Sequence, residues 1–227
     1  MFDRVIAPSL LAADFSRLRK EVQRVEQSGA DWLHLDVMDG NFVPNISFGP
    51  ALVKAIRPHT SLPFDVQLMV AHPGAYIDAF AAAGANRITV HIEAAGGQSD
   101  VRHLLRGIRD RGCKAGLAIN PETPLSRAEP FLGEIDLLLV MTVHPGFGGQ
   151  AFIPKTVEKI EAAFVRRAAL GLTFRIEIDG GVTWETAAAG LLAGADVLVA
   201  GTSLFRAPDM AAAIHELRAL GGRENRR

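Results

Sequence analysis

Glycine recurs at the end of one helix-like segment after another, with an apolar, strand-like run starting a few residues later. The recurrent positions are Gly29, Gly84, Gly112, Gly171 and Gly194. Glycine ends helices because it readily adopts the left-handed conformation that closes the last turn. The intervals between these glycines are 55, 28, 59 and 23 residues, which correspond to one or two strand–helix units each. A chain that alternates strands and helices in this way is expected to build a parallel sheet.

Eight segments fit strands and eight fit helices. The strands are predicted within residues 4–9, 32–40, 64–70, 87–91, 114–119, 135–140, 174–179 and 197–200. The helices are predicted at 14–28, 49–56, 73–83, 99–111, 124–131, 154–170, 186–193 and 209–220. The first strand lacks the GxGxxG turn of an open nucleotide-binding sheet, and 227 residues suit a closed barrel. We therefore predict an α/β protein with one (β/α)8 TIM-barrel domain over 1–227 and a disordered tail at 221–227.

Composition excludes several classes of function. The formal net charge of -1 gives no electrostatic reason to expect nucleic acid or an anionic membrane as a partner. The single cysteine, Cys113, excludes an intrachain disulfide and a multi-cysteine metal cluster. No apolar run approaches the roughly 20 residues that span a bilayer, and no signal-peptide pattern precedes the first strand. These features favour a cytoplasmic protein.

His34 and Asp36 lie two residues apart at the end of the second strand. Because side chains alternate along a strand, both point to the same face. A histidine and a carboxylate are costly to bury without a purpose, although a structural ion pair at a strand end remains an equal alternative for this segment alone.

Other unusual residues also follow strands, where the active sites of such barrels lie. Ser9 follows the first strand, and small residues follow the last three: Gly146, Gly148, Gly149, Gly180, Gly181, Gly201 and Thr202, with Phe147 among them. Because Arg206 is the nearest cation to these loops, we expect backbone amides rather than a cationic clamp to hold a phosphate. The alternative is three unrelated tight turns.

Asp36 and Asp179 are predicted on strands that face one another across the barrel mouth. Paired carboxylates on opposite sides of a pocket suit proton transfer at one carbon from either face. His34 beside Asp36 suggests a divalent metal with Asp179 as a further ligand, and a buried ion-pair network is the alternative. Three methionines near strand ends, Met38, Met69 and Met141, either cap this pocket or pack in the core.

Three long motifs then resemble a known family. They are HLDVMDGNFVPN at 34–45, MTVHPGFGGQ at 141–150 and EIDGGV at 177–182, within a similarity that runs from about residue 6 to residue 202. They resemble ribulose-phosphate 3-epimerase, a (β/α)8 barrel of the pentose phosphate pathway that interconverts D-ribulose 5-phosphate and D-xylulose 5-phosphate.

The resemblance implies one divalent metal ion (Zn, Fe, Mn, Co or Mg) held by His34, Asp36 and Asp179. It implies that Asp36 and Asp179 act as acid and base, and that Ser9 contacts the substrate. The glycine loops would hold the phosphate of this small-molecule substrate, and a homo-oligomer is expected.

Residue 67 departs from the family pattern, which has a second metal-binding histidine at this place on the third strand. Here Gln67 stands in the sequence Gln67-Leu68-Met69, and strand parity directs it toward the pocket and substrate. Its amide oxygen is a weaker and harder ligand than imidazole. The site is therefore expected to favour Mg²⁺ or Mn²⁺ over Zn²⁺, to hold metal weakly, or to lose it. His72, in a loop, and His91, on another strand, are not expected to replace the histidine.

Two other functions stay open. One is 3-epimerisation of a longer ketose phosphate such as allulose 6-phosphate, because sequence does not reveal the chain length that the pocket accepts. The other is a phosphosugar-binding barrel in which Gln67 has weakened catalysis, although two opposed carboxylates argue against a pure binder. The phosphate-binding barrels of tryptophan and histidine biosynthesis would share the glycine loops without requiring the His-x-Asp strand.

Overall fold

A computed structural model of the chain describes residues 2–221. Apart from Gly221, the tail predicted at 221–227 lies outside the described residues. Within 2–221, eight parallel strands form one sheet in the order β1-β8-β7-β6-β5-β4-β3-β2. The strands are β1 (Val5–Pro8), β2 (Leu33–Met38), β3 (Phe64–Met69), β4 (Arg87–His91), β5 (Lys114–Ile119), β6 (Leu137–Met141), β7 (Arg175–Asp179) and β8 (Val197–Ala200).

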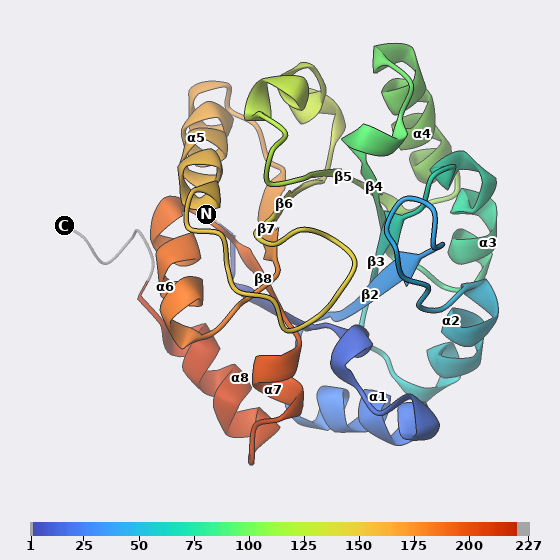
Figure 1. Cartoon of the computed structure of the whole chain (residues 1–227), viewed down its shortest axis with the longest axis vertical. Coiled ribbons are helices and arrows are strands. Elements are labelled where there is room, and N and C mark those ends of the chain that lie inside the picture. Colours follow the sequence, from blue (N-terminus) through green and yellow to red (C-terminus); the bar gives the residue numbers. More distant parts are fainter. Residues whose placement is uncertain (1, 222–227) are drawn as a thin grey trace.

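The sheet curls into a nearly closed barrel, and the helices surround it (Figure 1). The two strands at its ends, β1 and β2, meet at a single bridging pair, Ser9 with His34. Beneath that pair, the backbone N–H of Asp31 donates to the carbonyl of Ile6 at 3.0 Å. We call this narrow junction the seam. The predicted (β/α)8 TIM-barrel fold is confirmed.

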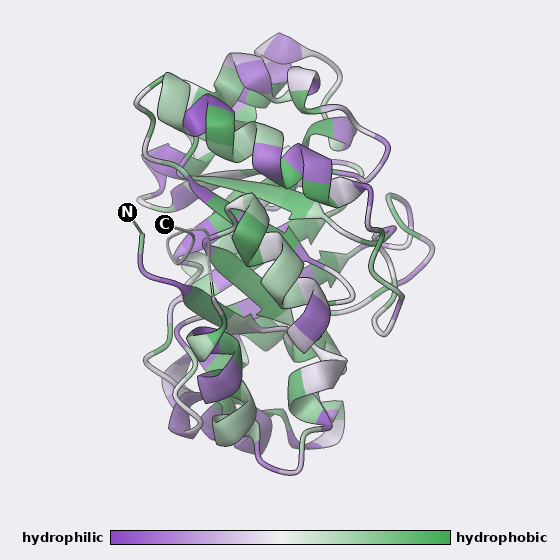
Figure 2. Cartoon of the chain, turned by 90° about the vertical axis from the view of Figure 1, so that its left-hand side faces the viewer, coloured by the Kyte–Doolittle hydropathy of each residue, from purple (hydrophilic) through white to green (hydrophobic). Residues whose placement is uncertain are grey.

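The helices cover the outside of the barrel, and several of them carry hydrophilic residues beside hydrophobic ones (Figure 2). They are α1 (Leu18–Gln27), α2 (Pro50–Ile56), α3 (Ile77–Ala82), α4 (Gln98–Asp110), α5 (Thr156–Ala169), α6 (Trp184–Ala193), α7 (Thr202–Phe205) and α8 (Met210–Ala219). None of the helices in the described part of the chain is both long enough and apolar enough to cross a bilayer.

One helix prediction is wrong, and one short helix was not predicted. The segment 124–131 is not an α-helix but forms two 3₁₀ segments, Leu125–Arg127 and Glu129–Glu134. Pro130 near the start of the second segment lacks the N–H that an α-helix running through it would need, and Gly133 adds backbone freedom. The short helix α7 was missed because four residues are too few to show a helical period.

The side chains of each strand alternate between two cores. Outward residues such as Leu33 and Leu35 pack with the helices in the larger core. Inward residues of β1, β5, β6 and β8 form a smaller apolar core that includes Ala118 and Leu139. On β2, β3, β4 and β7 the inward positions are instead largely polar.

Candidate active site

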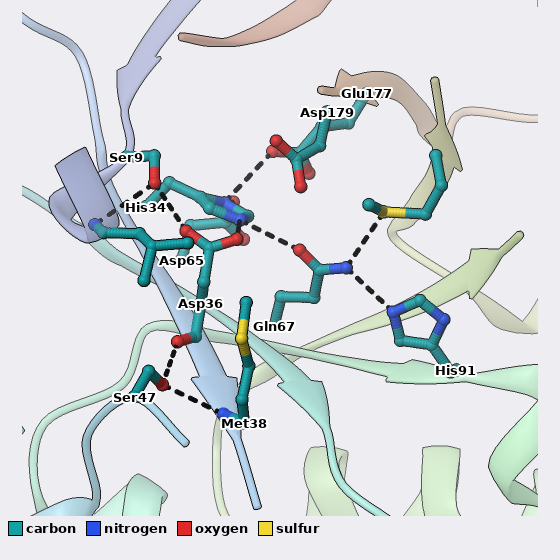
Figure 3. Close-up of polar contacts among 12 residues, drawn as sticks. Ser9, His34, Asp36, Met38, Ser47, Asp65, Gln67, His91, Glu177 and Asp179 are labelled. Carbon is teal, nitrogen blue, oxygen red and sulfur yellow. Dashed lines mark hydrogen bonds and ion pairs between the residues drawn. The ribbon is translucent and has the colours of Figure 1, made fainter. Parts of the chain in front are cut away.

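One histidine lies at the centre of the polar residues inside the barrel. His34, fully buried on β2, directs its Nδ1 toward Asp65 Oδ2 at 2.8 Å and its Nε2 toward Asp36 Oδ1 at 3.6 Å (Figure 3). Burial alone would lower the pKa of His34, but the carboxylates of Asp36 and Asp65 raise it well above its usual value. His34 therefore bears a positive charge when no metal occupies Nε2, and a metal ion there would displace a proton.

Asp36 and Asp179 lie on the cavity side of His34. Ser9 Oγ donates a 2.5 Å hydrogen bond to Asp36 Oδ2, which ties the end of β1 to β2. One ligand atom from each of His34, Asp36 and Asp179 falls within 4.8 Å of the other two, as metal coordination requires. Burial, followed by the negative charge of Asp36, raises the pKa of Asp179 to about 7. Asp179 can thus exist as an acid or as a base near neutral pH.

Asp65 and Glu177 lie on the opposite side of His34, sealed from the cavity. Glu177 Oε1 is 3.6 Å from His34 Nδ1, and both carboxyls are at most 1% exposed. Burial opposes the ionisation of Asp65, yet its hydrogen bond with His34 keeps the pKa of Asp65 below its usual value. Burial, followed by the charge of Asp65, raises the pKa of Glu177 well above its usual value. The pair consequently carries one negative charge, on Asp65.

Gln67 lies beside the same histidine. Its Oε1 is 3.1 Å from His34 Nε2, so its oxygen is directed toward the position that Asp36 also faces. The amide nitrogen points away, 2.8 Å from Nε2 of His91 on β4 and 3.1 Å from Sδ of Met141 on β6. These contacts place Gln67 inside the barrel, as strand parity indicates.

A cavity of about 630 Å³ opens above these residues at the carboxyl ends of the strands. Its lining includes Asp36 and Asp179 together with all three predicted methionines, Met38, Met69 and Met141. Each methionine is at most 4% exposed, so it contacts both the cavity and the core. The cavity extends along the glycine loops, whose lining residues are Gly146, Phe147, Gly148, Gly149, Gly180, Gly181, Gly201 and Thr202.

The glycine loops pack so closely that larger residues do not fit at two positions. Gly181 has a φ of +63°, and a Cβ there would lie 2.5 Å from the backbone nitrogen of Phe152. Gly180 has a φ of +114°, and its Cβ would meet the side chain of Val143 at 2.3 Å. Both glycines are therefore required by backbone conformation and by space. They bring the loops after β6 and β7 together at one end of the cavity.

The loop after β2 joins this arrangement from the other side. Asn45 Nδ2 donates to the carbonyl oxygen of Gly146 at 2.8 Å, which links the loop after β2 to the loop after β6. Phe147 remains 55% exposed at the rim. The hydrogen bond thus fixes the loop after β2 against one of the loops that line the cavity.

Comparison with known proteins identifies the family. A sequence model described as the ribulose-phosphate 3 epimerase family matches residues 5–205. The chain belongs to this family. It is 48% identical to the ribulose-phosphate 3-epimerase of Synechocystis over 94% of this chain and 93% of that protein. It is 47% identical to the Bacillus subtilis enzyme over 94% and 97%, and 43% identical to the Escherichia coli enzyme over 94% of both.

Solved structures of more distant proteins share the barrel. KGPDC from Streptococcus mutans superimposes with a TM-score of 0.70 over 98% of this chain and 100% of that one, at 14% identity. A mutant tryptophan synthase α-subunit from Pyrococcus furiosus gives 0.69 over 97% and 99%, at 16% identity. At these identities the likeness concerns the fold alone.

The cavity lining includes every site residue that the sequence predicted for this epimerase-family chain except His34 and Gln67, which lie beneath it in contact with each other. Four further residues near His34 and Gln67 were not predicted: Asp65, Glu177, His91 and Glu93. The first two occupy inward positions on β3 and β7, two residues before Gln67 and Asp179, so strand parity could have found them. His91 was set aside because it lies on a different strand, yet β3 and β4 are neighbours and bring it into contact with Gln67.

Proposed function

We propose that this protein interconverts D-ribulose 5-phosphate and D-xylulose 5-phosphate by moving the proton at C3. The single observation that carries the chemistry is the position of Asp36 and Asp179. They reach one cavity from β2 and β7, with His34 beside them. The family and the relatives named above, which align over more than nine-tenths of the chain, support this substrate.

Asp36 and Asp179 serve as the two proton-transfer groups. The one in its carboxylate form removes the proton at C3, which is acidified by the neighbouring C2 ketone. The other, in its acid form, returns a proton to the opposite face. A pKa of about 7 allows Asp179 to take either form near neutral pH, as a reversible epimerisation requires. Ser9 donates to Asp36 and so restricts the rotation of that carboxyl.

One divalent metal ion is proposed between His34, Asp36, Gln67 and Asp179. The donor set fits such an ion, because three ligand atoms converge within 4.8 Å and the Gln67 oxygen faces the same His34 nitrogen. The ion, when bound, would polarise the ketone and stabilise the negative charge of the enediolate. With one nitrogen and three oxygen donors, the site should favour Mg²⁺ or Mn²⁺ over Zn²⁺.

The glycine loops after β6, β7 and β8 are the proposed phosphate site. Small residues allow backbone N–H groups to approach an anion, and Arg206 contributes a positive charge to the lining of the same end of the cavity. Binding the remote phosphate positions C3 between the two carboxyls. The three methionines present apolar surface to the cavity in which the reacting carbon would lie.

The subcellular location and the oligomeric state of the protein stay predictions. A homo-oligomer and a cytoplasmic location are still expected, although one relative, 46% identical over 96% of this chain, is a chloroplastic enzyme of Arabidopsis thaliana.

A coupled assay tests the proposed function. Purified protein is stripped with chelator, reloaded separately with Mg²⁺, Mn²⁺, Co²⁺, Fe²⁺ or Zn²⁺, and supplied with D-ribulose 5-phosphate. We expect xylulose 5-phosphate to form and the metal-stripped protein to be inactive. D-Allulose 6-phosphate, run in parallel, distinguishes the longer substrate. Absence of turnover of ribulose 5-phosphate with all five ions would refute the proposal.

A further inference from the structure

The side chain of Gln67 has two ends of nearly the same shape and opposite chemistry. Its oxygen can bind a metal ion, whereas its NH₂ group only donates hydrogen bonds. A histidine at this position would not pose that choice between oxygen and NH₂. Because Gln67 is fully buried, surrounding side chains rather than water determine which end faces His34.

Both hydrogens of the Gln67 amide have acceptors on the side away from His34. Nε2 is 2.8 Å from His91 Nε2 and 3.1 Å from Met141 Sδ (Figure 3). A thioether sulfur accepts but cannot donate. A reversed amide would place its oxygen against that sulfur and its NH₂ group against His34, so the observed orientation satisfies more hydrogen bonds.

His91 can accept from Gln67 only if its Nε2 carries no proton, and Glu93 enforces that tautomer. Glu93 Oε2 lies 3.3 Å from His91 Nδ1 and accepts a hydrogen bond from the N–H group at that nitrogen. The other oxygen, Oε1, accepts from the backbone N–H of Asn120 at 2.8 Å and from the hydroxyl of Thr123. Phe42 packs against the imidazole with ring centroids 4.9 Å apart, which holds the ring in place.

We propose that His91 and Glu93 are positioning residues that fix the Gln67 amide with its oxygen toward the metal position between His34, Asp36 and Asp179. This inference rests on the proposed function, because it assumes that a metal ion binds there. It assigns a role to two residues that contact neither the ion nor the substrate. It also explains how a site with glutamine in place of histidine presents a defined oxygen ligand.

Mn²⁺ affinity, measured by the electron paramagnetic resonance signal of free Mn²⁺, tests the inference without any activity assay. His91→Leu removes the acceptor and should weaken Mn²⁺ binding by about 10- to 100-fold, the usual effect of losing a residue that orients a ligand. His91→Gln places an amide oxygen near the original Nε2 and should restore most of the affinity. Circular dichroism and thermal unfolding check that both variants are folded.

Gln67→Glu supplies the matched background. A carboxylate has an oxygen at both positions, so it has no amide orientation to lose. His91→Leu should therefore cost far less Mn²⁺ affinity when residue 67 is glutamate than when it is glutamine. An equal loss in the two backgrounds would show that His91 acts through general packing and would overturn the inference.

Nitrogen-15 NMR of histidine-labelled, metal-free protein provides a test that needs no variant to bind metal. We expect His91 to show a protonated Nδ1 and a bare Nε2, with assignment from the spectrum of His91→Gln. A protonated Nε2 would overturn the inference, because His91 would then donate to the Gln67 oxygen. If the proposed function is wrong, the coupled assay shows no turnover. The Mn²⁺ comparison and the NMR signal do not depend on turnover, so they test the role of His91 separately.

Discussion

Two pairs of carboxyl groups lie on opposite sides of one imidazole ring, and their surroundings differ. Asp36 and Asp179 line the cavity on the Nε2 side of His34. Asp65 and Glu177 lie on the Nδ1 side, sealed within the barrel. We call these the cavity pair and the sealed pair.

In the proposed mechanism, access to the cavity, rather than residue type, separates the carboxyls that react from those that support them. In the sealed pair, the raised pKa of Glu177 leaves one charge, which Asp65 places against His34 Nδ1. That charge orients the imidazole and makes Nε2 a better metal ligand. In the cavity pair, the proposed mechanism brings the carboxyls into contact with both a metal ion and the C3 proton.

The largest expected effect is a difference in kcat between variants of the cavity pair and a variant of the sealed pair. Asp36→Asn or Asp179→Asn should lower kcat by at least about 1,000-fold, because an amide cannot exchange protons at neutral pH. Glu177→Gln is the matched control, since Glu177 precedes Asp179 by two residues on the same inward face of β7. Steady-state kinetics of the three variants should show a far smaller loss for the control. A loss as large in Glu177→Gln would erase the distinction between the pairs.

A smaller effect is expected when the sealed pair loses its charge. Asp65→Asn keeps an oxygen that accepts from His34 Nδ1 but removes the negative charge, so Mn²⁺ affinity should fall by about tenfold. Glu177→Gln should bind Mn²⁺ nearly as well as the unaltered protein, because that carboxyl is already neutral. Isothermal titration calorimetry measures both. Similar losses in the two variants would mean that both sealed carboxyls are ionised.

The smallest expected effect is a pH-dependent change in stability caused by Asp179. Its pKa is raised from 3.8 to about 7 in the folded protein, so between these values the native state holds a proton that the unfolded state releases. The contribution of Asp179 to stability therefore falls as pH rises through this window. Asp179→Asn, which has no such proton, should gain on the order of 2 kcal/mol relative to the unaltered protein between pH 5 and pH 8.

Urea unfolding of the metal-free proteins at the two pH values measures this gain. The difference between the two proteins isolates Asp179 from other titrating groups. A constant difference from pH 5 to pH 8 would contradict the raised pKa.

The sequence predicted the barrel and the cavity pair because both leave local signals. Glycines mark the helix ends. Asp36 shares one strand face with His34, and Asp179 ends its own apolar strand directly before two glycines, so each carboxylate stands out locally. Strand parity places each member of the sealed pair inside the barrel, but the approach of β3 to β7 that brings them together depends on closure of the sheet. The contact of Gln67 with His91 likewise needs the register that pairs Gln67 with Thr89, two residues from His91.

The seam, where the barrel closes, lies among the residues of the proposed ligand site. Ser9 and His34, the only bridging pair between β1 and β2 in residues 2–221, belong to the same group of residues as Asp36. A ligand drawn against these side chains would hold the first and second strands together where the sheet itself supplies least hydrogen bonding. Ligand binding would then suppress opening of the whole barrel. The free energy of unfolding would therefore rise with ligand concentration. Ligand binding would thus strengthen the closure of the barrel between β1 and β2.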